Sequence, residues 1–283
     1  MTPFFSPREL INQLKALGIH LDKTRGQCFL IDRNIAEFIV NALDPCEKDS
    51  VLEIGPGLGT LTDFIFNKAG KLTLVEQDKK FYEFQNEHYK NNPNVMVLHG
   101  DALKIEWPMV NKIISNVPYQ ISGPLFAKIA TFNFEKGIFM VQKEFADRLI
   151  AVPNSADYGR LSVIYSLLFE VTILKQVSNT VFLPKPKVES TIISVIPKII
   201  ETTRQNEIRN HLNSLIKFLQ LIFPYKNKIL RRAIKDGMKT LNNERESAQL
   251  DNLLAYIERE GLAEKRVRAI TPEEFAILAM SIK

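Results

Sequence analysis

Residues 51–60, "VLEIGPGLGT", decide the fold, because a short apolar run passes directly into a turn with three glycines. An apolar run that ends at a turn signal is consistent with a buried strand. Glycines let the backbone of the turn come close to a ligand before a helix begins. The stretch therefore predicts a strand, a ligand-binding turn and a helix, in that order.

The same alternation continues along the chain. Further apolar runs lie at 72–75, 95–98, 112–115 and 137–142, and helical patterns lie between them, through residue 66, at 79–89 and at 122–130. Strands that alternate with helices are typical of a parallel sheet with helices on both faces. Runs at 170–177 and 189–196 flank a proline-rich loop, which predicts two antiparallel strands at a sheet edge.

Helices are expected at both ends of the chain. Ser6, Pro7 and Glu9 form a helix-start pattern that predicts a helix to about Leu17, and Asp32 is the expected N-cap of a second helix. Past Pro197 the pattern is helical, and the last helix opens with a capping box at 271–274. We expect an α/β domain over 1–200 and a small all-α domain over 201–283, with the boundary near 198–205.

Composition limits the function classes. The chain has 283 residues, 45% of them hydrophobic, and no apolar run near the ~20 residues needed to span a bilayer, so we expect a soluble, intracellular protein. The N-terminus also lacks the pattern of a secretory signal. Cys28 and Cys46 have no ligand spacing and the four histidines do not cluster, so neither a metal site nor a disulfide is expected.

Positive charge gathers near the C-terminus. The net charge is +5 and the pI is near 9.0, which is a mild preference for an anionic partner. Within 225–239 a single acid, Asp236, stands among six basic residues: Lys226, Lys228, Arg231, Arg232, Lys235 and Lys239. The segment alone fits a solvated helix face as well as a nucleic-acid contact.

Ligands of a doubly wound sheet bind outside the carboxyl ends of the strands, so the residues after each apolar run are the candidate site. The glycine turn carries Gly55, Gly57 and Gly59, with Glu53 just before it and Thr60 where the dinucleotide motif needs glycine. A carboxylate there disfavours a pyrophosphate and favours a ligand with an ammonium group. The turn therefore favours a cationic nucleoside over NAD.

Carboxylates also follow the next two strands. Glu76 stands about 20 residues past the glycines, where a carboxylate can accept both ribose hydroxyl protons. Asp101 can accept from an adenine amine while the backbone amide of Ala102 donates to the ring. Each also has an ordinary interpretation, Glu76 as an exposed strand end and Asp101 as a helix cap. Their order after the glycine turn favours the binding roles.

This set resembles the class I S-adenosylmethionine-dependent methyltransferases, whose fold is a Rossmann-like, mostly parallel sheet. The stretch "RGQCFL" at 25–30 is similar to the "GQxFL" element of the rRNA adenine dimethyltransferases, a family that includes KsgA and the Erm enzymes. The resemblance implies that S-adenosylmethionine is the cofactor and that Gln27, Cys28 and Leu30 contact its methionine part. Cys28 stands where the family usually has Asn or His, a harmless change if that contact runs through the backbone. The remaining implied cofactor residues are Gly55, Gly57, Glu76, Asp101, Ala102 and Asn116.

The stretch "KIISNVPYQIS" at 112–122 places an amide, a proline and an aromatic ring where a strand ends. The side-chain carbonyl of Asn116 and the backbone carbonyl of Pro118, which we expect to be free, can accept both hydrogens of an exocyclic adenine amine and direct its lone pair at a methyl donor. Tyr119 offers a ring on which the base can stack. For its amine to reach Asn116 and Pro118, the adenosine must be unpaired or flipped out of its stack. An ordinary strand-ending turn is the alternative.

Further stretches resemble the same family. "FLPKPKVES" at 182–190 is similar to its "FxPxPxVxS" loop, which implies that Phe182 closes the other face of the base, although it could be a core phenylalanine. Lys185 and Lys187 could meet phosphates or be solvated. "YGRLSV" at 158–163 favours the KsgA type over the Erm enzymes. The implied RNA contacts of the C-terminal domain are Lys226, Lys228, Arg231 and Arg232, mainly to phosphates.

The resemblance implies dimethylation of two adjacent adenosines in the 3′-terminal hairpin loop of small-subunit rRNA during ribosome biogenesis, by a cytoplasmic, monomeric enzyme acting on a pre-30S-type particle. Three alternatives stay open. An Erm-like enzyme would methylate large-subunit rRNA, and an assembly or transcription factor would use the fold mainly for binding. An NAD-linked oxidoreductase lacks support, because the third glycine of its fingerprint is missing.

Overall fold

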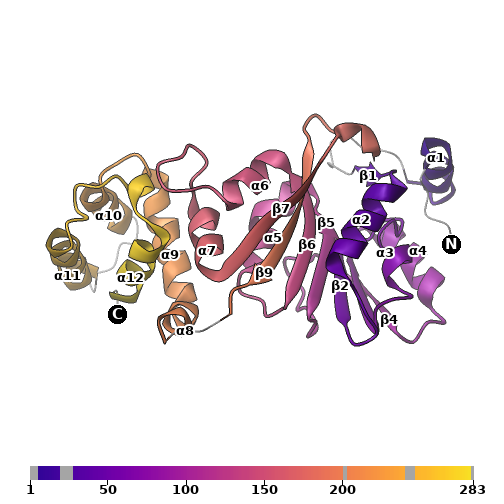
Figure 1. Ribbon diagram of the computed structural model, residues 1–283, viewed down its shortest axis with the longest axis horizontal. Coiled ribbons are helices and arrows are strands. Elements are labelled where there is room, and N and C mark those ends of the chain that lie inside the picture. The colour runs from indigo at the N-terminus through magenta and orange to yellow at the C-terminus, as the bar shows by residue number, and fades with distance from the viewer. Residues whose placement is uncertain (1–5, 20–27, 200–202, 240–245, 282–283) are drawn as a thin grey trace. The chain divides into compact units, whose positions relative to one another are not determined.

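The computed structural model describes residues 6–19, 28–199, 203–239 and 246–281 (Figure 1). Two compact units divide the chain: Met1–Ala146 with Glu170–Pro197, and Asp147–Phe169 with Lys198–Lys283. The sequence instead predicts domains of 1–200 and 201–283. The difference is the segment 147–169, whose apolar helical pattern does not reveal which core it joins.

A seven-stranded sheet forms the centre of the first unit. Its strand order is β4-β3-β2-β5-β6-β9-β7. These strands are β2 (Ser50–Ile54), β3 (Lys71–Glu76), β4 (Val95–His99), β5 (Lys112–Asn116), β6 (Lys136–Gln142), β7 (Phe169–Val177) and β9 (Ser190–Pro197). The first five pair in parallel, and β9 pairs antiparallel with β6. The mostly parallel sheet expected from the alternating pattern is confirmed.

Capping residues set the N-terminal helices. Helix α1 (Pro7–Ala16) begins where the Ser6 side chain accepts from the amide of Glu9, and α2 (Arg33–Leu43) begins where Asp32 accepts from the amide of Ile35. Both predicted helix starts are confirmed. The other helices of this unit are α3 (Thr62–Ile65), α4 (Lys79–Tyr89) and α5 (Ser122–Ile129); α6 (Lys143–Leu149) crosses into the second unit.

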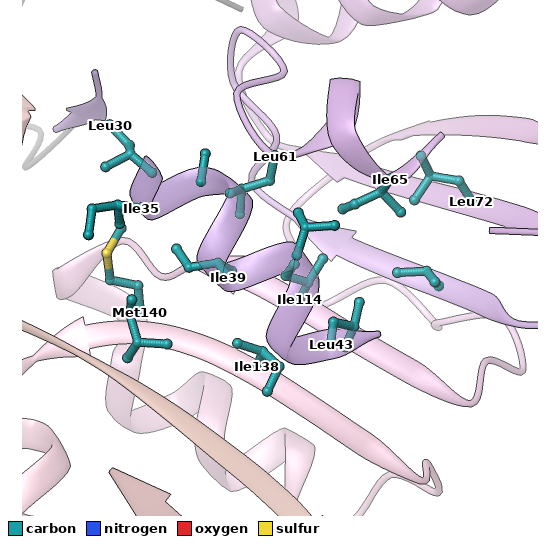
Figure 2. Packing of buried hydrophobic residues seen from close by; sticks show 14 of the residues in the cluster. Leu30, Ile35, Ile39, Leu43, Leu61, Ile65, Leu72, Ile114, Ile138 and Met140 are labelled. Atoms are coloured by element: carbon teal, nitrogen blue, oxygen red, sulfur yellow. The ribbon is translucent and has the colours of Figure 1, made fainter. Parts of the chain in front are cut away.

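Helices α2 and α5 cover opposite faces of the sheet. Ile138 and Met140 of β6 belong to the buried cluster that packs under α2 (Figure 2). Phe139, between them, meets Phe126 of α5 edge to face, with 5.1 Å between ring centroids. Because successive side chains of a strand point to opposite faces, helices cover both sides, as the sequence predicts. Each fully buried Ile or Leu of this core contributes about 1.5–3 kcal/mol.

A second, two-stranded sheet was not predicted. Strand β1 (Phe29–Leu30) pairs antiparallel with β8 (Phe182–Leu183), so Leu30 lies opposite Phe182. Two-residue strands leave no periodic signal in the sequence. Their pairing places Phe29 and Leu30, from the end of the "GQxFL" element, beside the start of the "FxPxPxVxS" loop, which lies far away in the sequence.

The second unit is helical. Its helices are α7 (Arg160–Leu168), α8 (Thr203–Asn210), α9 (Leu212–Ile222), α10 (Leu230–Met238), α11 (Glu246–Arg259) and α12 (Pro272–Ser281). The Tyr158 hydroxyl donates to the carbonyl of Ile270 at 2.9 Å, which ties the chain before α7 to the start of α12. The predicted capping box is confirmed, because Thr271 and Glu274 each accept the other's backbone amide. Past Pro197, no strand occurs in the part of the chain that the structure describes.

Over the described ranges, no helix has the length and apolar character needed to cross a bilayer. Among the same residues, His, Cys, Asp and Glu side chains do not gather in groups of three that could hold a metal ion.

Candidate active site

The glycine turn, which the sequence placed at the cofactor, leaves β2 through three residues of positive φ. Gly55, Gly57 and Gly59 have φ values of +70°, +54° and +86°. Only glycine adopts this region without strain, which explains why three of them follow the strand. The amide of Gly57 donates to Oε2 of Glu76 at 3.0 Å. The turn is therefore tied to the end of the neighbouring strand β3.

Glu76 is buried at the end of β3, with 7% of its surface exposed. Its second oxygen, Oε1, accepts from the amide of Asp78 at 2.9 Å. Burial raises the pKa of this carboxyl, and the amides of Asp78 and Gly57 oppose that shift. Each carboxylate oxygen has two acceptor positions, so both keep capacity for a ligand hydroxyl. The exposed-strand-end alternative does not fit this burial.

Glu53 is the most unusual group of the site. It is buried on β2, and its Oε2 has no hydrogen-bond partner in the part of the chain that the structure describes. Burial, with smaller contributions from the carboxylates of Asp63 and Glu76, raises its pKa to about 8. A buried, unpartnered carboxyl oxygen costs free energy unless a ligand supplies a donor. Glu53 borders a pocket, so a cationic ligand group could pair with it.

Asn116 closes β5 beside this pocket. Its side-chain nitrogen makes a long hydrogen bond, 3.4 Å, to the carbonyl of Cys28. With the nitrogen so used, the amide oxygen is the atom available to a ligand. The contact uses the backbone of Cys28, and burial raises the pKa of that thiol. Leu30, two residues on, is 2% exposed and belongs to the core cluster under α2 while bordering the pocket.

The expectation that the Pro118 carbonyl is free is wrong. It accepts from the amide of Ile121 at 3.1 Å, because Tyr119–Ile121 form a 3-10 turn directly after the proline. A carbonyl oxygen has two lone pairs, so one acceptor position is left for an amine hydrogen.

The two aromatic candidates differ in burial. Tyr119 is half-buried and borders the pocket, and its hydroxyl lies 2.8 Å from Oγ of Ser190. Phe182 borders the same pocket but is only 3% exposed, and it packs in the core cluster with Leu30. In the structure Phe182 therefore is a core residue that also forms part of the pocket wall.

A second pocket, about 400 Å³, lies next to the first and is lined by Gly100, Asp101 and Ala102. Both pockets share Gly55, Glu76 and Pro118. The volume lies within the ~300–1,000 Å³ usual for small-molecule sites. An extended ligand could thus lie along one continuous depression, with its middle at Glu76.

The loop behind the second pocket is braced from within. Asp101 holds its turn, because its Oδ1 accepts from the amide of Leu103 at 2.9 Å; no helix lies between β4 and β5, where every residue is described, so the helix-cap alternative is not borne out. The carbonyl of Ala102 accepts from Trp107 Nε1 and from Lys128 Nζ, at 2.9 and 2.8 Å. These bonds hold the loop that would meet an adenine ring.

The predicted RNA-contacting residues differ in whether another group of the protein already engages their side chains. Lys185 and Lys187 are exposed in the loop after β8. In the second unit, Arg231 pairs with Glu264 at 2.8 Å and with Glu258 at 3.7 Å, and Lys228 pairs with Asp236 at 2.8 Å. Lys226 donates to the carbonyl of Ala156. Arg232 is exposed in a groove that Asn227 and Arg266 also line.

Several residues of the site escaped the sequence-based assignment or lie beyond the description. Gln27, with Arg25 and Gly26, lies outside the described residues. Glu53 was considered only for its charge beside the turn, and its burial gave no sequence signal beyond its place in an apolar run. Ser190 had no signal at all except its position in the "FxPxPxVxS" loop. Arg266 reaches the basic groove through an isolated bridge to Ile229.

Comparisons with known proteins agree with this geometry. The family model described as "Ribosomal RNA adenine dimethylase" matches residues 20–264. The chain is 37% identical to the probable ribosomal RNA small subunit methyltransferase A of Pyrococcus furiosus, over 95% of this chain and 90% of that protein. It is 34% identical to the protein of the same name from Methanopyrus kandleri, over 94% of each chain.

Solved structures show the same fold. A crystal structure of a dimethyladenosine transferase from Plasmodium falciparum matches with a TM-score of 0.74 and 28% identity, over 88% of this chain and 95% of that one. The 23S rRNA methyltransferase ErmE matches with a TM-score of 0.59 and 23% identity, over 90% of this chain and 99% of that one, and shares the fold alone.

Proposed function

Because the chain belongs to the ribosomal RNA adenine dimethylase family, we propose that it dimethylates the exocyclic amines of two adjacent adenosines in the 3′-terminal hairpin loop of small-subunit rRNA. The methyl donor would be S-adenosylmethionine. The relatives at 34–37% identity carry a small-subunit name, which favours this target over the large-subunit target of an Erm-like enzyme. We further propose that it acts in the cytoplasm as a monomer, on a pre-30S-type particle.

The residues of the pockets fit S-adenosylmethionine. Glu53 offers an unpartnered oxygen to the ammonium group of the methionine part, and the backbone at Cys28 lies beside it. Glu76 lies where the two pockets join and would accept from the ribose hydroxyls. Asp101 and Ala102 would meet the adenine. When bound, S-adenosylmethionine supplies a methyl group on a positively charged sulfur.

The observation that carries the proposal is the arrangement at the end of β5. Asn116 keeps its amide oxygen for a ligand while its nitrogen is engaged by Cys28, and Pro118 and Tyr119 border the same pocket. The Asn116 oxygen and the remaining lone pair of the Pro118 carbonyl would accept the two amine hydrogens and hold the lone pair of the adenine nitrogen toward the methyl group. Tyr119 would stack on the base, which is worth roughly 1–3 kcal/mol.

No general base is needed to start the reaction. An exocyclic amine is a poor nucleophile because its lone pair is delocalised into the ring, so the role of the chain is to orient it. Alignment of the reacting atoms and fixed dipoles can supply most of the rate. Phe182 would close the other face of the base from the pocket wall.

The second unit would hold the RNA. Its exposed Arg232, together with the loop lysines Lys185 and Lys187 of the first unit, would contact phosphates, which sets the orientation of the RNA rather than a sequence preference. The groove that contains Arg232 also contains Lys228 and Arg266.

The test is to incubate purified protein with unmethylated small subunits and S-adenosylmethionine, then map methylated adenosines by mass spectrometry. Two neighbouring adenosines of the 3′-terminal hairpin should each gain two methyl groups. Modification only of large-subunit rRNA would reject the target. Cofactor binding without any methylation would instead support a factor that uses the fold for binding.

A further inference from the structure

Ser190 makes a buried hydrogen bond to the aromatic side chain that borders the pocket. Its Oγ lies 2.8 Å from the Tyr119 hydroxyl, and Ser190 is completely buried. It is the first residue of β9 and lies opposite Gln142 of β6 in the antiparallel ladder. A strand in the interior of a seven-stranded sheet is a rigid support, so the serine gives the tyrosine a fixed partner.

The tyrosine itself stands at a less constrained position. It begins the 3-10 turn Tyr119–Ile121, where no side chain caps the turn. The first side-chain torsion of a tyrosine swings the whole ring and moves its distal oxygen, so a bond to that oxygen restricts where the ring lies. Burial raises the pKa of the Tyr119 phenol, so the hydroxyl stays protonated and can donate.

Phe182, on the same pocket, comes from the same stretch of chain as Ser190. It lies in β8, eight positions before the serine, and β8 is fixed by its pairing with β1. Segment 182–190 therefore contains one aromatic residue of the pocket wall, Phe182, and supports the other, Tyr119, through a hydrogen bond. Two rings that hold one base must keep a fixed separation, and a common support provides that.

We propose that Ser190 is a positioning residue that fixes where the ring of Tyr119 lies in the pocket, so that segment 182–190 sets both sides of the slot for the target adenine. The inference rests on the proposed function, because it gives the slot a base to hold. Ser190 touches neither the base nor the cofactor. Its contribution passes entirely through the tyrosine.

The variants Tyr119→Phe, Ser190→Ala and their double mutant test this coupling. Tyr119→Phe keeps the ring and removes only the hydroxyl, and Ser190→Ala removes only its partner. Each single change should lower kcat on small subunits roughly 10-fold, because one buried hydrogen bond is lost, and leave the KM for S-adenosylmethionine within about twofold. Since both changes remove the same bond, the double mutant should lose no more than the single mutants.

Two further variants separate positioning from a purely structural role. Ser190→Thr keeps a hydroxyl and should restore most of kcat. Ser194→Ala removes a second buried serine four residues along the same strand and should leave kcat unchanged. Small subunits that carry 2-aminopurine at the target position should show less stacking-dependent quenching with Ser190→Ala than with the unmodified chain.

Losses that multiply in the double mutant would overturn the inference, since the two groups would then act separately. So would full kcat in Ser190→Ala, or an equal loss in Ser194→Ala. In each of these cases the unmodified chain is still active and the proposed function stands. If the unmodified chain itself fails to methylate small subunits, the proposed function falls and the inference falls with it.

Discussion

The carboxyl edge of the sheet and the surface of α10 both carry residues that the sequence assigned to binding, but they hold them differently. At the sheet edge, Glu76 and Asn116 are engaged by backbone groups of neighbouring segments and still border a pocket. On α10, Arg231 is paired with two acids from elsewhere in its unit, while Arg232, the next residue, is exposed. The end of a parallel strand predicts which side chains lie close together. A run of basic residues on a helix does not predict which of them are free to bind RNA.

The largest effect is expected from a substitution of Asn116. Asn116→Ala removes the acceptor from the sheet edge and should lower the rate of methyl transfer by about 100- to 1000-fold, as loss of one preorganised polar group does in other enzymes. Cofactor affinity should stay roughly intact, because the lost interaction belongs to the transition state. Single-turnover methylation and cofactor titration of the same variant measure the two quantities. Retained turnover would exclude the assigned role.

Glu76 tests whether the edge also binds the cofactor. Glu76→Ala should weaken S-adenosylmethionine binding roughly 10- to 100-fold, because hydrogen bonds to a charged group contribute about 1.5–3 kcal/mol. Calorimetric titration gives the dissociation constant, and Glu76→Gln, which keeps one acceptor oxygen, should lie between. Thermal unfolding controls for the lost support of the Gly57 and Asp78 amides. An unchanged dissociation constant would reject ribose recognition.

Glu53 makes the folding stability at the sheet edge sensitive to pH. Its pKa is raised from an ordinary 4.5 to about 8, so between these values the folded protein keeps a proton that the unfolded chain has lost. Raising the pH through that window therefore favours unfolding, by up to about 1.4 kcal/mol per pH unit. Below about pH 4.5 both states are protonated and the effect vanishes.

Denaturant unfolding of the cofactor-free protein at pH 5.5, 6.5 and 7.5 measures this dependence. Glu53→Gln keeps the shape of the side chain without the titration, so its free energy of unfolding should change less across the series. Asp63 and Glu76, whose pKa values burial also raises, titrate in both proteins, so the difference between the two series reports Glu53 and its coupling to these two carboxyls. If the free energies of unfolding of the two proteins changed equally with pH, Glu53 would not be the group responsible.

The smallest effect is expected on α10. Arg232→Gln should reduce the slope of log affinity against log salt for subunit binding by about one unit, because one phosphate contact is lost. Arg231→Gln is the matched control: it removes the same charge from the adjacent residue, whose guanidinium already serves Glu264 and Glu258. Filter binding over a salt series compares them. Equal slopes for the two variants would mean that the paired arginine and the exposed arginine contribute alike to RNA binding.

Most of the first unit could be predicted from the sequence, because its signals are local. Apolar runs predicted the seven main strands, and the capping residues Ser6 and Asp32 predicted where two helices begin. The β1–β8 pair could not be predicted, since each strand has two residues and their meeting depends on the tertiary fold. Likewise, segment 147–169 contains Tyr158, whose hydrogen-bond partner Ile270 lies more than a hundred positions away.

For the candidate site, strand order explains which of the predicted residues lie together. Glycine turn, Glu76 and Asp101 follow successive strands, so a parallel sheet necessarily gathers them. What failed depended on hydrogen bonds that no pattern reveals. The Pro118 carbonyl is engaged by a 3-10 turn, and the serine behind Tyr119 belongs to a strand 71 positions later. Pairing of Arg231 was hidden for the same reason.

The strand order has a consequence for the nascent chain. β9 lies between β6 and β7, although within the described residues it is the last strand to leave the ribosome. Until Pro197 has emerged, β6 and β7 lack the neighbour that joins them, and Tyr119 lacks the serine beside it. The support behind Tyr119 is therefore completed late in translation, after every residue that lines the pocket has been made.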